Sequence, residues 1–243
     1  MNIIKLIWRK ALKIYKNSKL QVLTSKVLEK LKFEGFYLSY SQFGEDIILE
    51  NIFRGKGKGI YIDVGCNRPI EGNNTFKMYL SGWRGINIDG NKELIESFNK
   101  VRPEDININA IISDSKEKVK FYISRDDRVS TISEEFKEWI KDNRSYETYI
   151  EVIPKTLTEI VSKHLKPDDK IDFLNVDVEG HDLEVIKSIN LEVFRPEIIC
   201  VEDHLFDFQI KEDSKLYTYL TENQYKLIAF SRPNLFFQNI NKQ

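Results

Sequence analysis

The chain has 243 residues, of which 41% are apolar and 31% are charged, a composition typical of a globular domain. Its length suits one large domain, or one domain with an appendage. The 37 basic and 38 acidic residues leave a net charge of −1, which argues against a general nucleic-acid binder.

Residues 1–33 differ electrostatically from the rest, because nine Lys or Arg residues face a single acid, Glu29. Apolar residues such as Ile4, Trp8 and Leu12 recur there at helical spacing, with lysines on another face. We therefore predict a basic amphipathic helical extension over residues 1–33 and a second unit over residues 34–243. Two roles remain open for the extension. It packs on the domain or on a second subunit of a homodimer, or it makes a peripheral contact with an anionic membrane at its inner face.

The two cysteines, Cys66 and Cys200, are too few and too far apart for a disulfide framework, so a cytoplasmic setting is the default. No apolar run approaches the roughly 18 residues needed to span a bilayer. Charges also interrupt the N-terminal segment too often for a signal peptide.

From residue 41 onward, helical and strand-like patterns alternate along the chain. Predicted strands occupy residues 60–64, 86–89, 106–113, 119–124, 171–178, 197–203, 225–230 and 234–239, with a short one near 152. Predicted helices occupy residues 41–53, 75–80, 91–101, 156–165, 181–189 and 214–223. The polar and aromatic stretch over residues 124–149 is a plausible lid. This order predicts an α/β fold with a doubly wound, mostly parallel sheet that ends in a strand pair.

The ends of the first two strands indicate a nucleoside ligand. In such sheets, ligands bind outside the carboxyl ends of the strands. Asp63 and Gly65 end the first strand, where an acid suits a cation and not a pyrophosphate. Asp89 ends the second strand, where its two oxygens can accept both ribose hydroxyls. S-adenosylmethionine is a nucleoside that carries a cation, and it fits this pattern.

Several separated motifs then carry a family resemblance. The stretches "YIDVGCNRPIEGNNTFKMYLSGWRGINIDGN", "RPEDININAIISD" and "IDFLNVDVEGHDLEVIKS", with "SQFGEDIILENIF" ahead of them, resemble the FkbM family of S-adenosylmethionine-dependent methyltransferases. The resemblance covers roughly residues 40–240. It implies the class I methyltransferase fold, a Rossmann-like, seven-stranded, mostly parallel sheet with helices on both faces and a terminal antiparallel hairpin.

The resemblance also implies a set of cofactor contacts. Asp63, Gly65 and Asn67 would line the methionine part of the cofactor, and Asp89 would hold the ribose. Further contacts are expected from Gln42, Asn74, Thr75, Ala110 and Ile111. Relatives carry another glycine where Arg68 and Pro69 stand, so the loop after the first strand departs from the family pattern.

The fourth strand of the expected sheet ends at Asp177, and the fifth at Glu202 and Asp203. Two chemical interpretations remain open. In one, Asp177, Glu202 and Asp203 bind Mg²⁺ or Mn²⁺, which orients the acceptor hydroxyls. In the other, Asp177, Glu179 or His181 removes the hydroxyl proton without a metal. Asp182 is interpreted as a capping residue at a helix start.

The predicted function is that of an S-adenosylmethionine-dependent O-methyltransferase. By resemblance, its acceptor is a sugar or sugar nucleotide in polysaccharide or glycolipid biosynthesis. Aromatic and basic lid residues would recognise it, namely Arg125, Arg128, Trp139, Arg144 and Tyr146. Two alternatives stay open: a methyltransferase for amines or small molecules, and a non-catalytic, membrane-recruited scaffold with the same fold.

Overall fold

The computed structural model describes residues 18–30, 37–124, 130–133, 146–166 and 168–241. The strands are β1 (Ile60–Val64), β2 (Arg84–Asp89), β3 (Ile106–Asn109), β4 (Val119–Ser124), β5 (Tyr146–Val152), β6 (Phe173–Val176), β7 (Ile198–Glu202), β8 (Tyr225–Ser231) and β9 (Asn234–Asn239). The helices are α2 (Lys19–Lys30), α3 (Glu45–Ile52), α4 (Phe76–Leu80), α5 (Lys92–Val101), α7 (Leu157–His164), α8 (Asp182–Lys187) and α9 (Lys215–Glu222), with a 3₁₀ turn at Lys211–Asp213.

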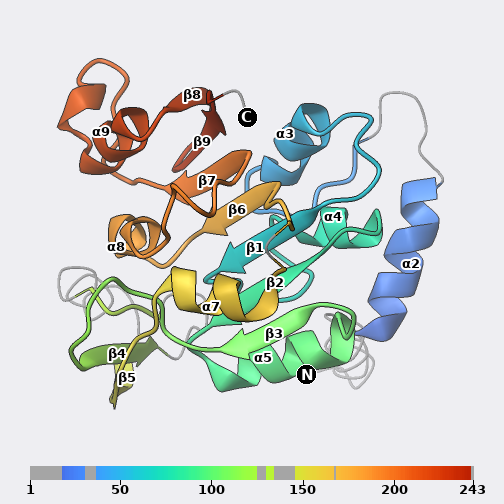
Figure 1. The fold of residues 1–243 in the computed structure, drawn as a ribbon. Helices are drawn as coiled ribbons and strands as arrows, with labels where there is room; N and C mark the ends of the chain where they lie inside the picture. Colours follow the sequence, from blue (N-terminus) through green and yellow to red (C-terminus); the bar gives the residue numbers. More distant parts are fainter. Residues whose placement is uncertain (1–17, 31–36, 125–129, 134–145, 167, 242–243) are drawn as a thin grey trace, which may run out of the picture.

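Seven strands form one sheet in the order β3-β2-β1-β6-β7-β9-β8 (Figure 1). The pairs β1–β2, β2–β3, β1–β6 and β6–β7 are parallel, whereas β9 runs antiparallel to both β7 and β8. This is the sheet order of the class I methyltransferase fold, so the predicted fold class is confirmed. The order reverses direction between β1 and β6, where a crevice for ligands forms at the carboxyl ends.

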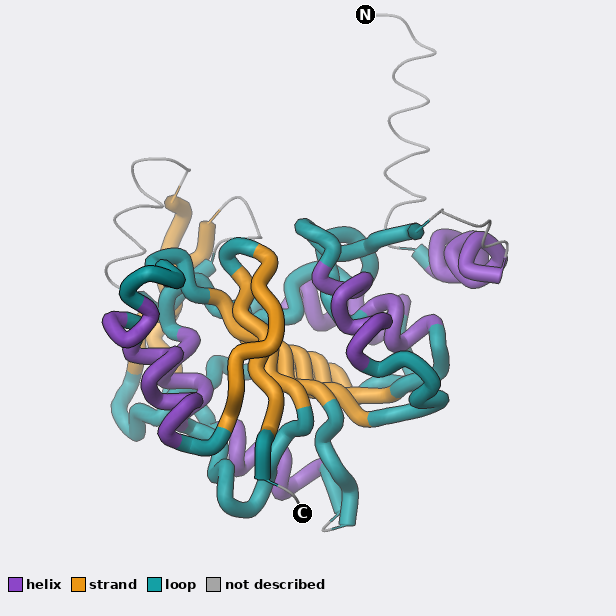
Figure 2. Tube along the Cα trace, turned by 90° about the horizontal axis from the view of Figure 1, so that it is seen from above, coloured by secondary structure: helices purple, strands orange, loops and turns teal. Residues whose placement is uncertain are grey.

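Helices cover both faces of the sheet, as Figure 2 shows from above. On one face, Leu157 of α7, Val185 of α8 and Leu220 of α9 pack on the sheet around Ile62. On the other face, Leu49 of α3 and the aromatic residues of α4 pack around Tyr61. The alternation of Tyr61 and Ile62 between two buried faces explains the unbroken apolar runs of the central strands.

The structure differs from the sequence expectations in three segments. The third strand ends at Asn109, and Ile112 makes only an isolated bridge with Lys155. The hairpin expected from residues 119–124 is present, but its partner β5 starts at Tyr146 and absorbs the end of the predicted lid. The helix predicted from residue 41 begins only at Glu45, because Gly44 adopts a left-handed conformation with φ +84°.

Part of the predicted N-terminal extension packs on the domain. Val22 and Ser25 of α2 are buried, and the helix contacts α4 and α5. The opposite side exposes Leu20, Leu23 and Val27. Residues 1–17 and the predicted boundary at residue 33 lie outside the described residues. Among the described residues, every helix is too short or too polar to cross a bilayer.

Candidate active site

A cavity of about 1630 Å³ opens at the carboxyl ends of β1, β2, β6 and β7. Most of the side chains predicted to contact the cofactor or the acceptor line it: Gln42, Asp63, Gly65, Asn67, Asn74, Asp89, Ala110, Ile111, Asp177, Glu179, His181, Glu202 and Asp203. Thr75 does not. The sequence therefore located one contiguous site from residues spread over most of the domain.

Asp63 lies at the centre of a buried hydrogen-bond network. Its carboxylate accepts hydrogen bonds from Thr75 Oγ1 at 2.7 Å and from Asn175 Nδ2 at 2.9 Å. Asn73 Nδ2 lies 3.3 Å from the same carboxylate. Burial raises the pKa of Asp63, although these hydrogen bonds and the nearby Arg102 act in the opposite direction. Asp63 therefore presents an oriented negative group at the end of β1.

Thr75 supports this network and does not contact the cavity. It is fully buried, and its hydroxyl donates to Asp63 and accepts from Arg102 Nη1 at 2.9 Å. Its position ahead of α4 turns the side chain inward, so Thr75 supports Asp63 from behind and does not line the cavity. Asn74, by contrast, lines the cavity and donates to Asn175 Oδ1 at 3.1 Å.

Gly65 and Asn67 shape the loop after β1. Gly65 has φ +75°, and a Cβ there would lie 1.8 Å from the carbonyl oxygen of Asp177. Asn67 also adopts a positive φ of 52°, and its backbone N–H donates to Asp89 Oδ2 at 3.0 Å. The Asn67 side-chain oxygen Oδ1 is buried without a hydrogen-bond partner. A buried acceptor of this kind is expected to meet a donor from a bound ligand.

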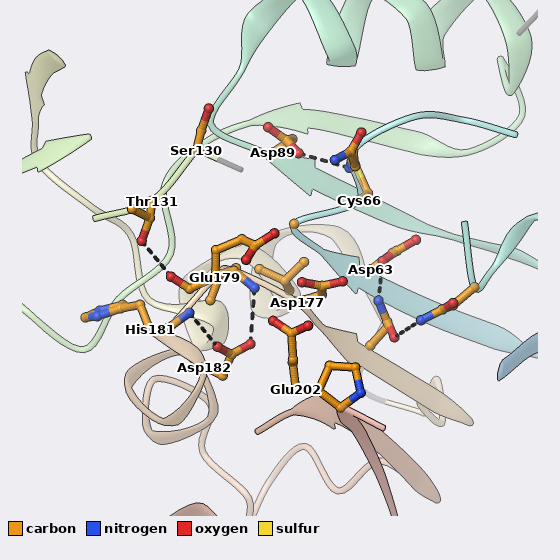
Figure 3. Close-up of a pocket in the computed structure, with 18 of the residues that line it drawn as sticks. Asp63, Cys66, Asp89, Ser130, Thr131, Asp177, Glu179, His181, Asp182 and Glu202 are labelled. Carbon is orange, nitrogen blue, oxygen red and sulfur yellow. Dashed lines mark hydrogen bonds between the residues drawn. The ribbon is translucent and has the colours of Figure 1, made fainter. Parts of the chain in front are cut away.

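The far end of the cavity has the features of a nucleoside pocket. Asp89 ends β2 with its carboxylate aimed into the loop of Asn67, as Figure 3 shows. Ala110 and Ile111 form an apolar wall beside it. Ser130 also lines this end, and its hydroxyl is buried without a hydrogen-bond partner. Sequence reasoning missed Ser130, because nothing in the lid sequence distinguishes it from neighbouring polar residues.

Gln42 reaches the cavity from the loop ahead of α3. Asp46 holds that loop by accepting hydrogen bonds from Ser39 Oγ and from the backbone N–H of Tyr40, both at 2.7 Å. Glu45 ties it to the terminal hairpin, since its Oε1 accepts from Asn234 Nδ2 at 3.0 Å. The acids of the "GED" motif are therefore structural anchors for Gln42.

The other end of the cavity gathers carboxylates from β6 and β7. The side chains of Asp177, Glu179 and Glu202 point toward one another, as Figure 3 shows. Burial raises the pKa of Asp177 well above its usual range, and the charges of Glu202 and Glu179 raise it further. This end of the cavity therefore attracts cations and hydrogen-bond donors.

The turn between β6 and α8 has an unusual backbone. Glu179 and Gly180 adopt positive φ values of 56° and 90°. Asp182 holds the turn by accepting hydrogen bonds from the backbone N–H groups of Val178 and Gly180, each at 3.1 Å. Asp182 is thus the first residue of α8 and braces the turn ahead of it, whereas the N-cap position is His181, which makes no side-chain cap hydrogen bond. Burial and the neighbouring Glu202 raise the pKa of Asp182 to about 8.

His181 does not join the carboxylates. It is directed away from them in Figure 3, and its Nε2 lies 3.0 Å from Ser113 Oγ. Burial lowers the pKa of the His181 ring. The backbone of the Glu179–Gly180 turn sets this direction, so the structure disfavours His181 as the base.

The side chain next to the Glu202 carboxylate is that of His204, whereas the sequence led us to expect Asp203 there. His204 Nε2 lies 3.1 Å from Glu202 Oε2, and the Glu202 carboxylate raises the pKa of His204. The Asp203 carboxylate instead accepts hydrogen bonds from the backbone N–H of Leu205 at 3.0 Å and from Ser214 Oγ at 2.7 Å. Asp203 is therefore engaged in shaping its own loop. The sequence showed a His beside two acids at a strand end, but not which of them faces the cavity.

The predicted lid is described only in part. Arg125, Arg128, Trp139 and Arg144 lie outside the described residues, as does the side chain of Tyr146. Thr131, which is described, is buried and donates from its hydroxyl to the backbone oxygen of Glu179 at 2.7 Å. The lid segment at residues 130–133 therefore contacts both ends of the cavity.

The residues at this site fit S-adenosylmethionine. Carboxylates from β1 and β6 suit its positive charge, Asp89 suits a ribose, and the orphaned oxygen of Asn67 accepts a donor such as its ammonium group. These are properties of the described side chains and do not depend on a family assignment.

Comparisons with known proteins agree with the family resemblance. The model of the methyltransferase FkbM domain matches residues 63–227, which is more than half of the chain. No protein with a curated description matches. Among solved structures, a chain from the crystal structure of a fibrillarin/Nop5p complex is 14% identical, over 85% of this chain and 87% of that chain, with a TM-score of 0.37. So low a score supports no conclusion. The family match places the chain in the FkbM methyltransferase family, and the protein is an S-adenosylmethionine-dependent methyltransferase.

Proposed function

We propose that the protein methylates a hydroxyl group of a sugar-containing acceptor, such as a sugar nucleotide. The supporting observation is the convergence of Asp177, Glu179 and Glu202 beyond the cofactor end of the cavity. Carboxylates that meet in this way accept hydrogen bonds from several neighbouring hydroxyls, which is what a sugar ring offers.

The size and charge of the cavity support a second ligand. Ligand pockets usually enclose about 300–1,000 Å³, and this cavity, at about 1630 Å³, leaves room for an acceptor beside the cofactor. Its basic lining residues are Arg68, Lys215 and Arg232, which suit the phosphate groups of a sugar nucleotide.

Asp177 is the base that we assign to the reaction. The backbone carbonyl oxygen of Asp177 lies where a side chain on Gly65 would be. Asp177 is therefore next to the loop after β1 that is expected to contact the cofactor. Among the described residues, no side chain donates a hydrogen bond to its carboxylate. When bound, S-adenosylmethionine supplies an electrophilic methyl group on a positively charged sulfur. The Asp177 carboxylate would take the proton of the acceptor hydroxyl as that oxygen receives the methyl group. Asp63 and Asp89 serve this step by holding the cofactor in line.

The test is methyl transfer from labelled S-adenosylmethionine to a panel of nucleotide sugars, free sugars, small alcohols and amines. Asp177→Asn should lower kcat by about 10²–10⁴-fold, the usual contribution of a positioned base, while cofactor affinity stays within a few fold. Asp207→Asn is the matched control, because Asp207 is exposed and lies outside the cavity.

Two results would contradict the proposal. Transfer to amines but to no hydroxyl would make the protein an N-methyltransferase. Cofactor binding without transfer to any acceptor would favour a non-catalytic scaffold with this fold.

A further inference from the structure

Three potential metal ligands meet at the acceptor end of the cavity. The turn after β6 supplies the Glu179 carboxylate, and the end of β7 supplies the Glu202 carboxylate and the His204 imidazole. One ligand atom from each lies within 4.8 Å of the other two. When ligand atoms bind one ion at distances of about 2.1–2.2 Å, two of them lie about 3 Å apart if the ligand–ion–ligand angle is about 90°. They lie about 4.3 Å apart if they are on opposite sides of the ion. The three donors are therefore close to the spacing that one ion imposes.

Glu202 provides an independent indication of a missing ligand. Its side chain is only 10% exposed, and its Oε2 is buried without a hydrogen-bond partner. Close to it lies His204 Nε2, at 3.1 Å, which forms an ion pair with that oxygen when the imidazole is protonated. Buried carboxylate oxygens are seldom left in this way, because their desolvation is costly. An ion bound between the two groups would replace this ion pair and satisfy the buried Glu202 oxygen.

The backbone of Glu179 is held in place by two independent groups. Its positive φ of 56° is uncommon for a residue with a side chain. Thr131 fixes the turn through the Glu179 carbonyl oxygen, and Asp182 fixes it through Val178 and Gly180. Strain that the surrounding structure enforces is frequent at functional sites. Here it directs the Glu179 carboxylate toward Glu202.

We propose that Glu179, Glu202 and His204 bind one divalent transition-metal ion, for which Mn²⁺ serves as the probe. Two carboxylates with one imidazole suit Mn²⁺ better than Mg²⁺, which prefers an all-oxygen shell. This ligand set differs from the sequence expectation of Asp177, Glu202 and Asp203. It leaves Asp177 free to act as the base.

The role of the ion rests on the proposed function. An ion at this position contacts the acceptor oxygen, orients the sugar and makes its hydroxyl more acidic. The proton passes to Asp177, the new oxygen–carbon bond forms, and the carbon–sulfur bond breaks to leave a neutral sulfur. The ion is neither oxidised nor reduced.

Mn²⁺ binding tests the site without any acceptor. The full chain is titrated with MnCl₂, and free Mn²⁺ is followed by its electron paramagnetic resonance signal. We expect one Mn²⁺ per chain, bound more tightly than Mg²⁺ in competition. Glu202→Gln and His204→Gln should each weaken binding by at least about tenfold. His204 is 53% exposed on its side chain, so His204→Gln is expected to fold even if Glu202→Gln does not.

Asp203→Asn separates the two ligand sets, and we expect it to keep wild-type Mn²⁺ affinity. The inference is overturned if the wild type binds no Mn²⁺, or if Asp203→Asn loses binding while His204→Gln keeps it. Methyl transfer that proceeds unchanged in EDTA would also overturn it, yet would leave the proposed function intact. Intact Mn²⁺ binding without transfer to any sugar would instead count against the proposed function alone.

Discussion

Replacing Arg102 tests how the cofactor end of the site is held together. Arg102 is fully buried, and its guanidinium donates to Pro69 O at 2.8 Å, to Thr75 Oγ1 at 2.9 Å and to Asn73 Oδ1 at 2.6 Å. Thr75 and Asn73 in turn hold Asp63. One buried cation therefore fixes both the loop after β1 and the Asp63 carboxylate.

The expected magnitude follows from what Arg102→Met leaves behind. Methionine fills much of the volume and keeps contact with the surrounding rings, so a large cavity is not expected. The loss comes from acceptors without donors and from Asp63 and Asp105, whose pKa values Arg102 lowers. Removing one partner from a buried charge network costs about 3–5 kcal/mol. For a chain of this size, about 4 kcal/mol lowers Tm by roughly 8–16 °C.

Thermal unfolding and S-adenosylmethionine titration measure the two consequences. We expect Arg102→Met to lower Tm by the stated amount and to weaken cofactor binding by about tenfold, or 1.4 kcal/mol. Arg102→Lys keeps the charge with fewer aligned donors and should fall in between. Arg54→Met is the control, since Arg54 is exposed and, within the part of the chain that the structure describes, its side chain hydrogen-bonds to Asn51 one helical turn earlier. If Arg102→Met and Arg54→Met shift Tm equally, the buried network does not stabilise this loop.

Three other predictions concern packing, pH and the N-terminus. Gly65→Ala should reduce both stability and cofactor affinity, because its Cβ would meet Asp177 at 1.8 Å, whereas Gly57→Ala has open space and should change neither. Because burial raises the pKa of Asp182 to about 8 in the folded protein, well above the usual range of an aspartate, the folded state binds the extra proton. The stability of the cofactor-free protein should therefore fall as pH rises from about 4 to 8, and a Tm at pH 6 that does not exceed the Tm at pH 8 would be a contradiction. Deleting residues 1–33 should abolish co-sedimentation with vesicles that contain phosphatidylglycerol, because that segment carries basic residues and α2 exposes an apolar side. If the deletion instead changes a dimer to a monomer and leaves vesicle binding unchanged, the segment serves oligomerisation.

The sequence predicted the sheet well because its signals are local and redundant. Each central strand is a short apolar run, and an acid or glycine marks the carboxyl end of β1, β2, β6 and β7. Parallel topology then brings those ends together whatever the details of the loops. The cofactor side of the site followed from this, since Asp63, Gly65 and Asp89 each lie at a strand end.

What the sequence did not predict depends on loop backbone conformation. Asn74 and Thr75 are adjacent, yet only Asn74 reaches the cavity, and the start of α4 decides between them. His181 and His204 each follow a strand end beside acids. The left-handed Glu179–Gly180 turn directs His181 onto Ser113, while His204 stays beside Glu202. A positive φ at a glutamate has no sequence signature, so this difference was visible only in three dimensions.

The loop after β1 and the turn after β6 meet at Gly65, where there is no room for a side chain. Arg102 and its partners hold the loop of Gly65, and Thr131 and Asp182 hold the turn of Glu179. At the junction, the Asp177 carbonyl occupies the space of a Gly65 Cβ. Methyl transfer requires the methyl donor and the acceptor atom to lie within about 3–3.5 Å of each other. The loop of Gly65 and the turn of Glu179 must therefore pack directly against each other, with no side chain between them. Gly65 packs against the backbone of Asp177, the base that we propose, so the "DVG" and "DVEG" motifs lie in contact although more than 100 residues separate them.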